Sequence, residues 1–141
     1  GNRTYKYNSD HFDAFKSPNY PTLAEAGVEI KYNKNALIKK NKKKLIVHTK
    51  IENNIAVLKL FPGINKKITS SILNSKEIKA IVLESFGAGN ASTEKWFINE
   101  LKRAINKGVI ILNITQCSEG KVIQGKYETS SQLKKISPVI L

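Results

Sequence analysis

The second half of the chain contains three short apolar runs that each have the length of a strand. Their sequences are IAVLKLF, AIVLESF and VIILNIT, at residues 55–61, 80–86 and 109–115. Pro62 and Gly63 follow the first run directly, which is a turn signal. Strands that are apolar along their whole length are typical of parallel sheets with both faces covered. We therefore expect one parallel sheet with helices on both of its faces.

Amphipathic segments separate these runs and predict two helices. Asn65 is placed to cap the first helix, which would have Ile68 and Ile72 on one face. Ser92 or Thr93 is expected to cap the second helix. The second helix is defined by an apolar stripe, a flanking aromatic residue and a glycine stop: Phe97, Leu101, Ala104, Ile105, Trp96 and Gly108. The alternation of strands and helices indicates the α/β class.

The first part of the chain has a different pattern. Residues 12–30 contain two prolines and three aromatic residues, which predicts an irregular, partly buried segment. The Lys- and Asn-rich residues 31–44 predict a connector, and LIVHTKI at 45–51 predicts a strand. We divide the chain into an N-terminal segment at 1–38, a connector and strand at 39–53, and the α/β domain at 54–141.

Three loops follow the expected strands, with sequences FPGIN, GAGNAS and TQCSEG. In open parallel sheets, ligands bind beyond the carboxyl ends of the strands, so these loops form the candidate site. Gly87 and Gly89 permit a sharp turn, and the amide of Asn90 offers a donor and an acceptor. A plain strand-to-helix turn is the alternative, because a G-x-G without a third glycine is a weak dinucleotide signal.

The net charge of +13 suggests nucleic-acid binding, but the composition of the charge argues against it. Only two of the 24 Lys and Arg residues are arginines, Arg3 and Arg103, whereas phosphate recognition favours Arg. The dense run KKNKKKL at 39–45 lacks aromatic residues that could stack on bases. We interpret it as a solvated linker.

The cysteine and histidine content and the lengths of the apolar stretches exclude further kinds of site and location. Cys117 is the only cysteine, so neither an internal disulfide nor a Cys-based metal site is expected. His48 has no acidic, Ser or Cys partner nearby in the sequence, and both His48 and His11 are interpreted as ordinary histidines. No apolar stretch is long enough to span a bilayer, and the N-terminus has no signal-peptide pattern. A cytoplasmic location without a membrane partner is expected.

Two long segments resemble the bacterial type I, cytoplasmic L-asparaginase family. Residues 83–133 contain G-x-G-N, a helix pattern and NITQCSEG in the order found in the family's C-terminal domain. Residues 1–27, with RTYK and FDAFKSPNYPTLAEAG, are similar to the end of its N-terminal domain. The resemblance implies a flavodoxin-like parallel sheet preceded by a remnant of an N-terminal α/β domain.

The resemblance also implies a function, the hydrolysis of L-asparagine to L-aspartate and ammonia without a cofactor or metal. In the family a threonine near the N-terminus is the nucleophile, and a lysine that matches Lys6 assists proton transfer. The asparagine that matches Asn90 reaches the substrate in a neighbouring subunit of a homodimer or homotetramer. An asparagine-binding regulatory site is lined by positions that match Asn113, Thr115 and Cys117.

Several positions depart from the family pattern. Glu84 stands where the regulatory site has an arginine, so we expect no activation by asparagine. Tyr5 replaces the threonine before the lysine, and Pro138 puts a turn in doubt. The threonine nucleophile loop is absent from these residues, so we expect a fragment that is inactive alone. The alternatives are a non-catalytic remnant, an amidotransferase-type relative and, as the weakest, a basic nucleic-acid binder.

Overall fold

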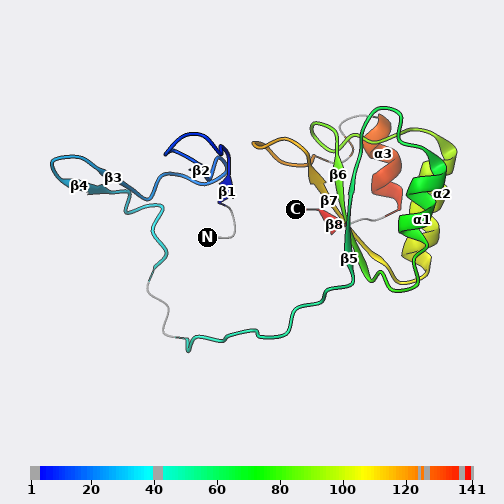
Figure 1. The fold of residues 1–141 in the computed structure, drawn as a ribbon, viewed down its shortest axis with the longest axis horizontal. Helices are drawn as coiled ribbons and strands as arrows, with labels where there is room; N and C mark the ends of the chain where they lie inside the picture. Colours follow the sequence, from blue (N-terminus) through cyan, green and yellow to red (C-terminus); the bar gives the residue numbers. More distant parts are fainter. Residues whose placement is uncertain (1–3, 40–42, 124, 126–127, 137–138, 141) are drawn as a thin grey trace. The chain divides into compact units, whose positions relative to one another are not determined.

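The computed structural model describes residues 4–39, 43–123, 125, 128–136 and 139–140. Pro138 lies outside the described residues. The chain divides into two compact units, Gly1–Thr49 and Lys50–Leu141 (Figure 1). The division falls within the connector that the sequence predicts at 39–53.

The N-terminal unit contains two short antiparallel ribbons. Strand β1 (Tyr5–Lys6) pairs with β2 (Phe15–Lys16), and β3 (Ala24–Ala26) pairs with β4 (Ile30–Tyr32). The expected irregular character of residues 12–30 is confirmed, since long stretches between these strands have no regular structure. The expected partial burial is slight, because no described side chain of this unit is fully buried.

The strand predicted at residues 45–51 does not form. These residues have no strand assignment, and Leu45, Val47 and Ile51 expose 90%, 70% and 81% of their surface. The physical reason is the missing partner: a strand is stabilised by a ladder of hydrogen bonds with a neighbour, and no described residue supplies one here.

The C-terminal unit is built on a four-stranded parallel sheet in the order β5, β6, β7, β8. Its strands are β5 (Ile55–Lys59), β6 (Ala80–Ser85), β7 (Ile110–Thr115) and β8 (Val139–Ile140). The first three confirm the predicted apolar runs and their common direction. Val57 pairs with Val82, which pairs with Leu112, so the strands are in level register. Strand β8 adds an edge that the sequence analysis did not expect.

The helices of this unit are α1 (Lys66–Leu73), α2 (Lys95–Asn106) and α3 (Glu128–Lys135). The Asn65 cap is confirmed, since its side-chain oxygen accepts from the backbone N–H of Ile68 at 3.0 Å. The cap expected for α2 is wrong. The N-cap is Glu94, whose side chain makes no capping hydrogen bond. The Ser92 hydroxyl accepts from the backbone N–H of Glu94 and so acts before the helix begins. Gly108 follows α2 with φ of 88°, as its predicted stop requires.

The apolar faces of the helices are only partly as predicted. In α2, Phe97, Leu101 and Ala104 are buried and so confirm the stripe. In α1, however, Ile68 is 50% exposed, and the buried residues are Thr69 and Leu73. Ile72, the other residue of the predicted face, is partly buried and packs against the core, so the buried face of α1 is shifted by about one position from the predicted one.

The described helices cover only one face of the sheet. Figure 1 shows α1, α2 and α3 on the same side of the strands. On that side Leu58 and Leu83 are buried, whereas on the other Val57 and Ile110 are 61% and 59% exposed. The expectation of a sheet covered on both faces is wrong for the described residues, because they supply a single layer of helices.

A buried carboxylate joins α1 to α2. Glu100 of α2 accepts from Asn74 Nδ2 at 3.1 Å and from Arg103 Nη2 at 2.6 Å. Lys107 Nζ donates to the Asn74 oxygen at 3.2 Å and extends the network. Burial raises the pKa of Glu100, but the Asn74 hydrogen bond and the Arg103 charge outweigh it, so this pKa lies below its ordinary value.

The one-sided core predicts opposite outcomes for two neighbouring residues of β5. Leu58→Ala should lower the free energy of unfolding by about 2–5 kcal/mol, because Leu58 is only 3% exposed. Val57→Ala should cost less than about 1 kcal/mol, because its side chain points to the exposed face. Urea unfolding of the 141-residue chain measures both. Equal losses would contradict the one-sided packing.

The Glu100 network predicts a pH dependence of stability. A carboxylate with a depressed folded pKa stabilises above its unfolded pKa of about 4.3, and this contribution is lost as pH falls through the folded value. Glu100→Gln should therefore destabilise the chain most at pH 7, and the difference should shrink toward pH 3. Urea unfolding across this range measures it, with the exposed Glu77→Gln as the control. A difference that does not change with pH would contradict the account.

Candidate functional site

The three loops that follow β5, β6 and β7 leave the same end of the sheet, as predicted (Figure 1). The register sets this arrangement, because Lys59 pairs with Glu84 and Ser85 pairs with Thr115 at the last rungs of the ladders. Gln116 joins the loops directly through side-chain hydrogen bonds to the carbonyl oxygens of Leu60 and Glu84. We call this end of the sheet the rim.

The loop after β6 is a tight turn that presents Asn90. The N–H groups of Gly89 and Asn90 both donate to the carbonyl of Phe86, at 3.0 and 2.8 Å. The N–H of Phe86 donates to the carbonyl of Asn90 at 2.8 Å and closes the turn. Gly87 and Gly89 have φ of 49° and 109°. Asn90 is half-buried, so its amide lies at the rim without being enclosed in the core.

Both the lack of room for a side chain and the backbone conformation require glycine at position 89. A Cβ at this position would lie 2.6 Å from Val122 Cγ1, and its φ is one that L-residues rarely adopt. It would also lie 3.7 Å from Asn113 Nδ2. Val122 and Asn113 therefore pack directly against the turn that carries Asn90.

Asn113 is inside the protein rather than on a ligand-facing surface. Its side chain is 0% exposed, and its Oδ1 lies 2.7 Å from the Ser85 hydroxyl, which also lies 3.0 Å from the carbonyl oxygen of Ile114. Among the described residues, Asn113 Nδ2 has no hydrogen-bond partner. Asn113 is therefore a buried residue that packs under the turn bearing Asn90.

The other positions predicted for a regulatory site make internal contacts. Thr115 Oγ1 donates to the carbonyl of Gly87 at 2.5 Å and accepts from the N–H of Cys117 at 3.0 Å. Glu84 Oε2 lies 3.6 Å from Lys59 Nζ in an ion pair between β5 and β6. Because neighbouring residues of a strand face opposite sides, Glu84 lies on the other face of the sheet from Ser85 and Thr115.

Lys6 belongs to the N-terminal unit. It is exposed and pairs with Phe15 in the β1–β2 ribbon. Tyr5 contacts the edge of the Tyr7 ring, with ring centroids 6.3 Å apart. The Lys16 ammonium lies 3.9 Å from the centre of that ring.

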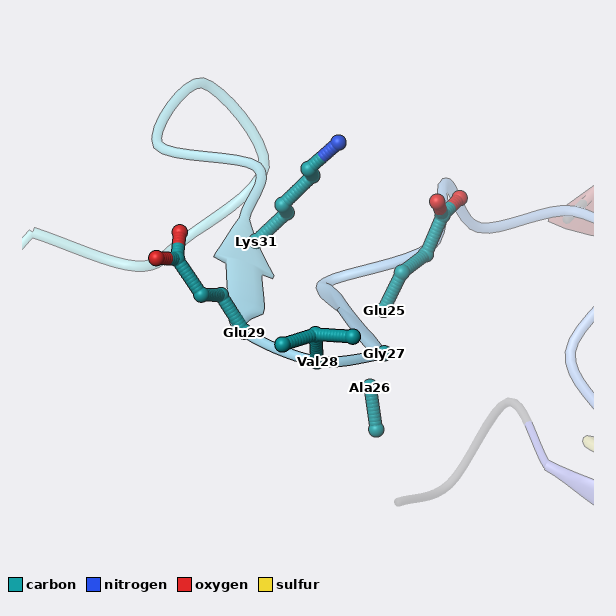
Figure 2. A pocket seen from close by; sticks show the side chains of 6 residues that line it. All are labelled: Glu25, Ala26, Gly27, Val28, Glu29 and Lys31. Atoms are coloured by element: carbon teal, nitrogen blue, oxygen red, sulfur yellow. The ribbon is translucent and has the colours of Figure 1, made fainter.

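A hollow with a volume of about 430 Å³ lies on the turn between β3 and β4. Figure 2 shows its side chains splayed around the turn, and Val28 at its tip is fully exposed. None of the site residues expected from the sequence lines it. Within the described ranges, no group of three His, Cys, Asp or Glu residues could hold a metal ion. None of the described helices is long and apolar enough to cross a membrane.

Sequence analysis missed the role of Gln116 and Ser85 at the rim. Gln116 was visible only as the middle residue of TQC, and Ser85 as a polar residue near the end of an apolar run. A polar side chain at the last position of a buried strand is a usable signal, because it faces strand-end carbonyls that need donors.

Comparisons with known proteins identify relatives of this chain. The model of the glutaminase/asparaginase C-terminal domain family matches residues 54–140. The chain is 41% identical to L-asparaginase 1 of Escherichia coli strain K12 over 133 residues, covering 94% of this chain and 39% of that protein. It is 30% identical to a subunit of the glutamyl-tRNA(Gln) amidotransferase of Pyrococcus abyssi over 137 residues, covering 96% of this chain and 31% of the relative.

A solved structure extends the similarity to the fold. The chain matches L-asparaginase I from Vibrio cholerae with a TM-score of 0.87 and 35% identity. The match covers 98% of this chain and 42% of that protein. The chain therefore spans less than half the length of these relatives.

The turn geometry predicts different costs for its two glycines. Gly87→Ala should cost about 1 kcal/mol, because nothing lies within 4 Å of its added Cβ and φ of 49° is close to the left-handed helical region. Gly89→Ala should cost about 3 kcal/mol, because strain and the contact with Val122 add. Urea unfolding measures both changes.

A third variant separates the two causes at Gly89. Val122→Ala removes the contacting methyl, so it should recover part of the loss when combined with Gly89→Ala. If the two glycine variants were equally stable, or if the Val122 change recovered nothing, the close packing of this turn would be contradicted.

Proposed function

The chain belongs to the glutaminase/asparaginase family, and on this basis we propose that it is a portion of an L-asparaginase. The reaction would be the hydrolysis of L-asparagine to L-aspartate and ammonia, which needs no metal or other cofactor. The observation that carries the proposal is the rim, where the loops that follow three parallel strands gather and a glycine turn at the carboxyl end of β6 bears Asn90.

We assign Asn90 to substrate binding. A carboxamide can accept from an ammonium group and donate to a carboxylate, and these are the two charged groups of an α-amino acid. Its half-buried position on a closed turn fits a residue that contacts a ligand at its edge. The proposed assembly is a homodimer or homotetramer, in which Asn90 meets the substrate of a neighbouring subunit. The proposed location is the cytoplasm.

Lys6 is the proposed proton-transfer residue. Its place in this chain is on an exposed ribbon, where its ammonium is open to partners beyond its own unit. The threonine nucleophile of the family is not among these residues, so the chain by itself should hydrolyse no asparagine. Lys6 would act only beside that threonine.

The absence of activation by asparagine remains part of the proposal. Glu84 and Thr115 lie on opposite faces of the sheet, which does not favour a shared amino-acid site, and the Glu84 carboxylate would repel the carboxylate of an amino acid. The internal engagement of Thr115 points the same way.

An amidotransferase-type relative is the second candidate. The similarity to an archaeal amidotransferase chain over 96% of this chain supports it. Such a protein also releases ammonia from a side-chain amide, so the two candidates differ in the substrate and share the chemistry. A non-catalytic remnant is the third candidate, and a nucleic-acid binder has no support from the described sites.

A chimera tests the assignment of Lys6. Replacing the matching stretch of E. coli L-asparaginase 1 with this chain supplies the missing threonine, and the chimera should release ammonia from L-asparagine. Lys6→Ala in the chimera should lower kcat by about 10²- to 10⁴-fold, the usual contribution of general acid–base catalysis. Lys16→Ala is the matched control on the same ribbon and should leave kcat unchanged.

Two results would contradict the proposal. The first is ammonia release from L-asparagine by the purified 141-residue chain alone. The second is an active chimera in which Lys6→Ala and Lys16→Ala have the same kcat. A chimera that prefers another amide would favour the amidotransferase-type candidate.

A further inference from the structure

We propose that Thr115 and Gln116 form a clamp that positions the turn bearing Asn90. The clamp contacts the backbone of β6 and of the turn, so it would act without contacting the substrate. The hydrogen bonds of the clamp do not depend on any activity of the chain. Only their link to substrate binding by Asn90 rests on the proposed function.

The side-chain amide of Gln116 connects the ends of three strands. Its Nε2 lies 2.5 Å from the carbonyl oxygen of Leu60 and 2.8 Å from that of Glu84. A carboxamide nitrogen carries two hydrogens, so it can donate to both oxygens at once. Leu60 follows β5, Glu84 belongs to β6, and Gln116 follows β7. One side chain therefore holds the three strand ends level.

Residues at the end of β7 and after it also donate hydrogen bonds to the backbone that leads into the Asn90 turn. The backbone N–H of Gln116 donates to the carbonyl of Ser85 at 3.0 Å, and the Thr115 hydroxyl donates to that of Gly87. Further along, the N–H of Ile123 donates to the carbonyl of Ala88 at 2.9 Å. Four backbone carbonyls shortly before Asn90 thus accept from the end of β7 and the segment that follows it: those of Glu84, Ser85, Gly87 and Ala88.

These contacts lie apart from the apolar core. Thr115 and Gln116 are half-buried, whereas the core of α2 is formed by buried residues such as Leu101. Loss of the clamp should therefore release the turn while the sheet and helices keep their packing. The orientation of Asn90 depends on this turn, because hydrogen bonds at Phe86 close it.

Hydrogen exchange of the full 141-residue chain tests the clamp. Thr115→Val and Gln116→Met keep size and remove the donors, so the amides of Gly89 and Asn90 should exchange about three- to tenfold faster in each. The amides of Leu101 and Ala104 should keep their rates within about twofold. Thr115→Ser retains the hydroxyl and should restore slow exchange, and Thr93→Val controls for a lost hydroxyl at an exposed position.

A second measurement, KM for L-asparagine, tests whether the clamp affects substrate binding. In the chimera with E. coli L-asparaginase 1, Thr115→Val should raise KM for L-asparagine about three- to tenfold with a smaller change in kcat. Thr115→Ser should restore KM.

The exchange rates distinguish a positioning role of the clamp from a general structural role. Unchanged exchange at Gly89 and Asn90 would overturn the clamp. Equal acceleration at the turn and in α2 would also overturn it, because it would show a general structural role. A chimera without activity would count against the proposed function, while the exchange rates would still decide on the clamp.

Discussion

The level register of β5, β6 and β7 is the constraint from which the candidate site follows. Parallel pairing aligns Lys59 with Glu84 and Ser85 with Thr115, so the strands end together and their loops meet at one rim. A shift of one residue would move Asn113 and Ser85 from the buried face to the exposed one. The Asn90 turn, the support beneath it and the bridging amide of Gln116 all depend on this alignment.

The features that the sequence predicted correctly are set by neighbouring residues. The three strands, the Asn65 cap and the apolar stripe of α2 arise from apolar period and local hydrogen bonding. The gathering of the loops also followed, because parallel strands place their carboxyl ends on one edge. The turn at Gly87 and Gly89 was visible from the spacing of two glycines before a helix.

The features that the sequence missed depend on distant partners. Residues 45–51 have strand composition but find no neighbouring strand, and the exposed face of the sheet has no second helical layer within the part of the chain that the structure describes. The burial of Asn113 and the bridging role of Gln116 depend on carbonyl and hydroxyl groups of other strands. The periodicity of apolar residues alone also could not predict that Thr69, rather than Ile68, faces the core.

We propose that the rim presents the amide of Asn90 to an amino acid held by a neighbouring subunit. A crystal structure of the chimera with bound L-aspartate tests it most directly. The account predicts an Asn90 side-chain atom within about 3 Å of a charged group of the aspartate, with the Thr115 and Gln116 hydrogen bonds intact. An occupied site with the Asn90 amide turned away from the ligand would contradict it.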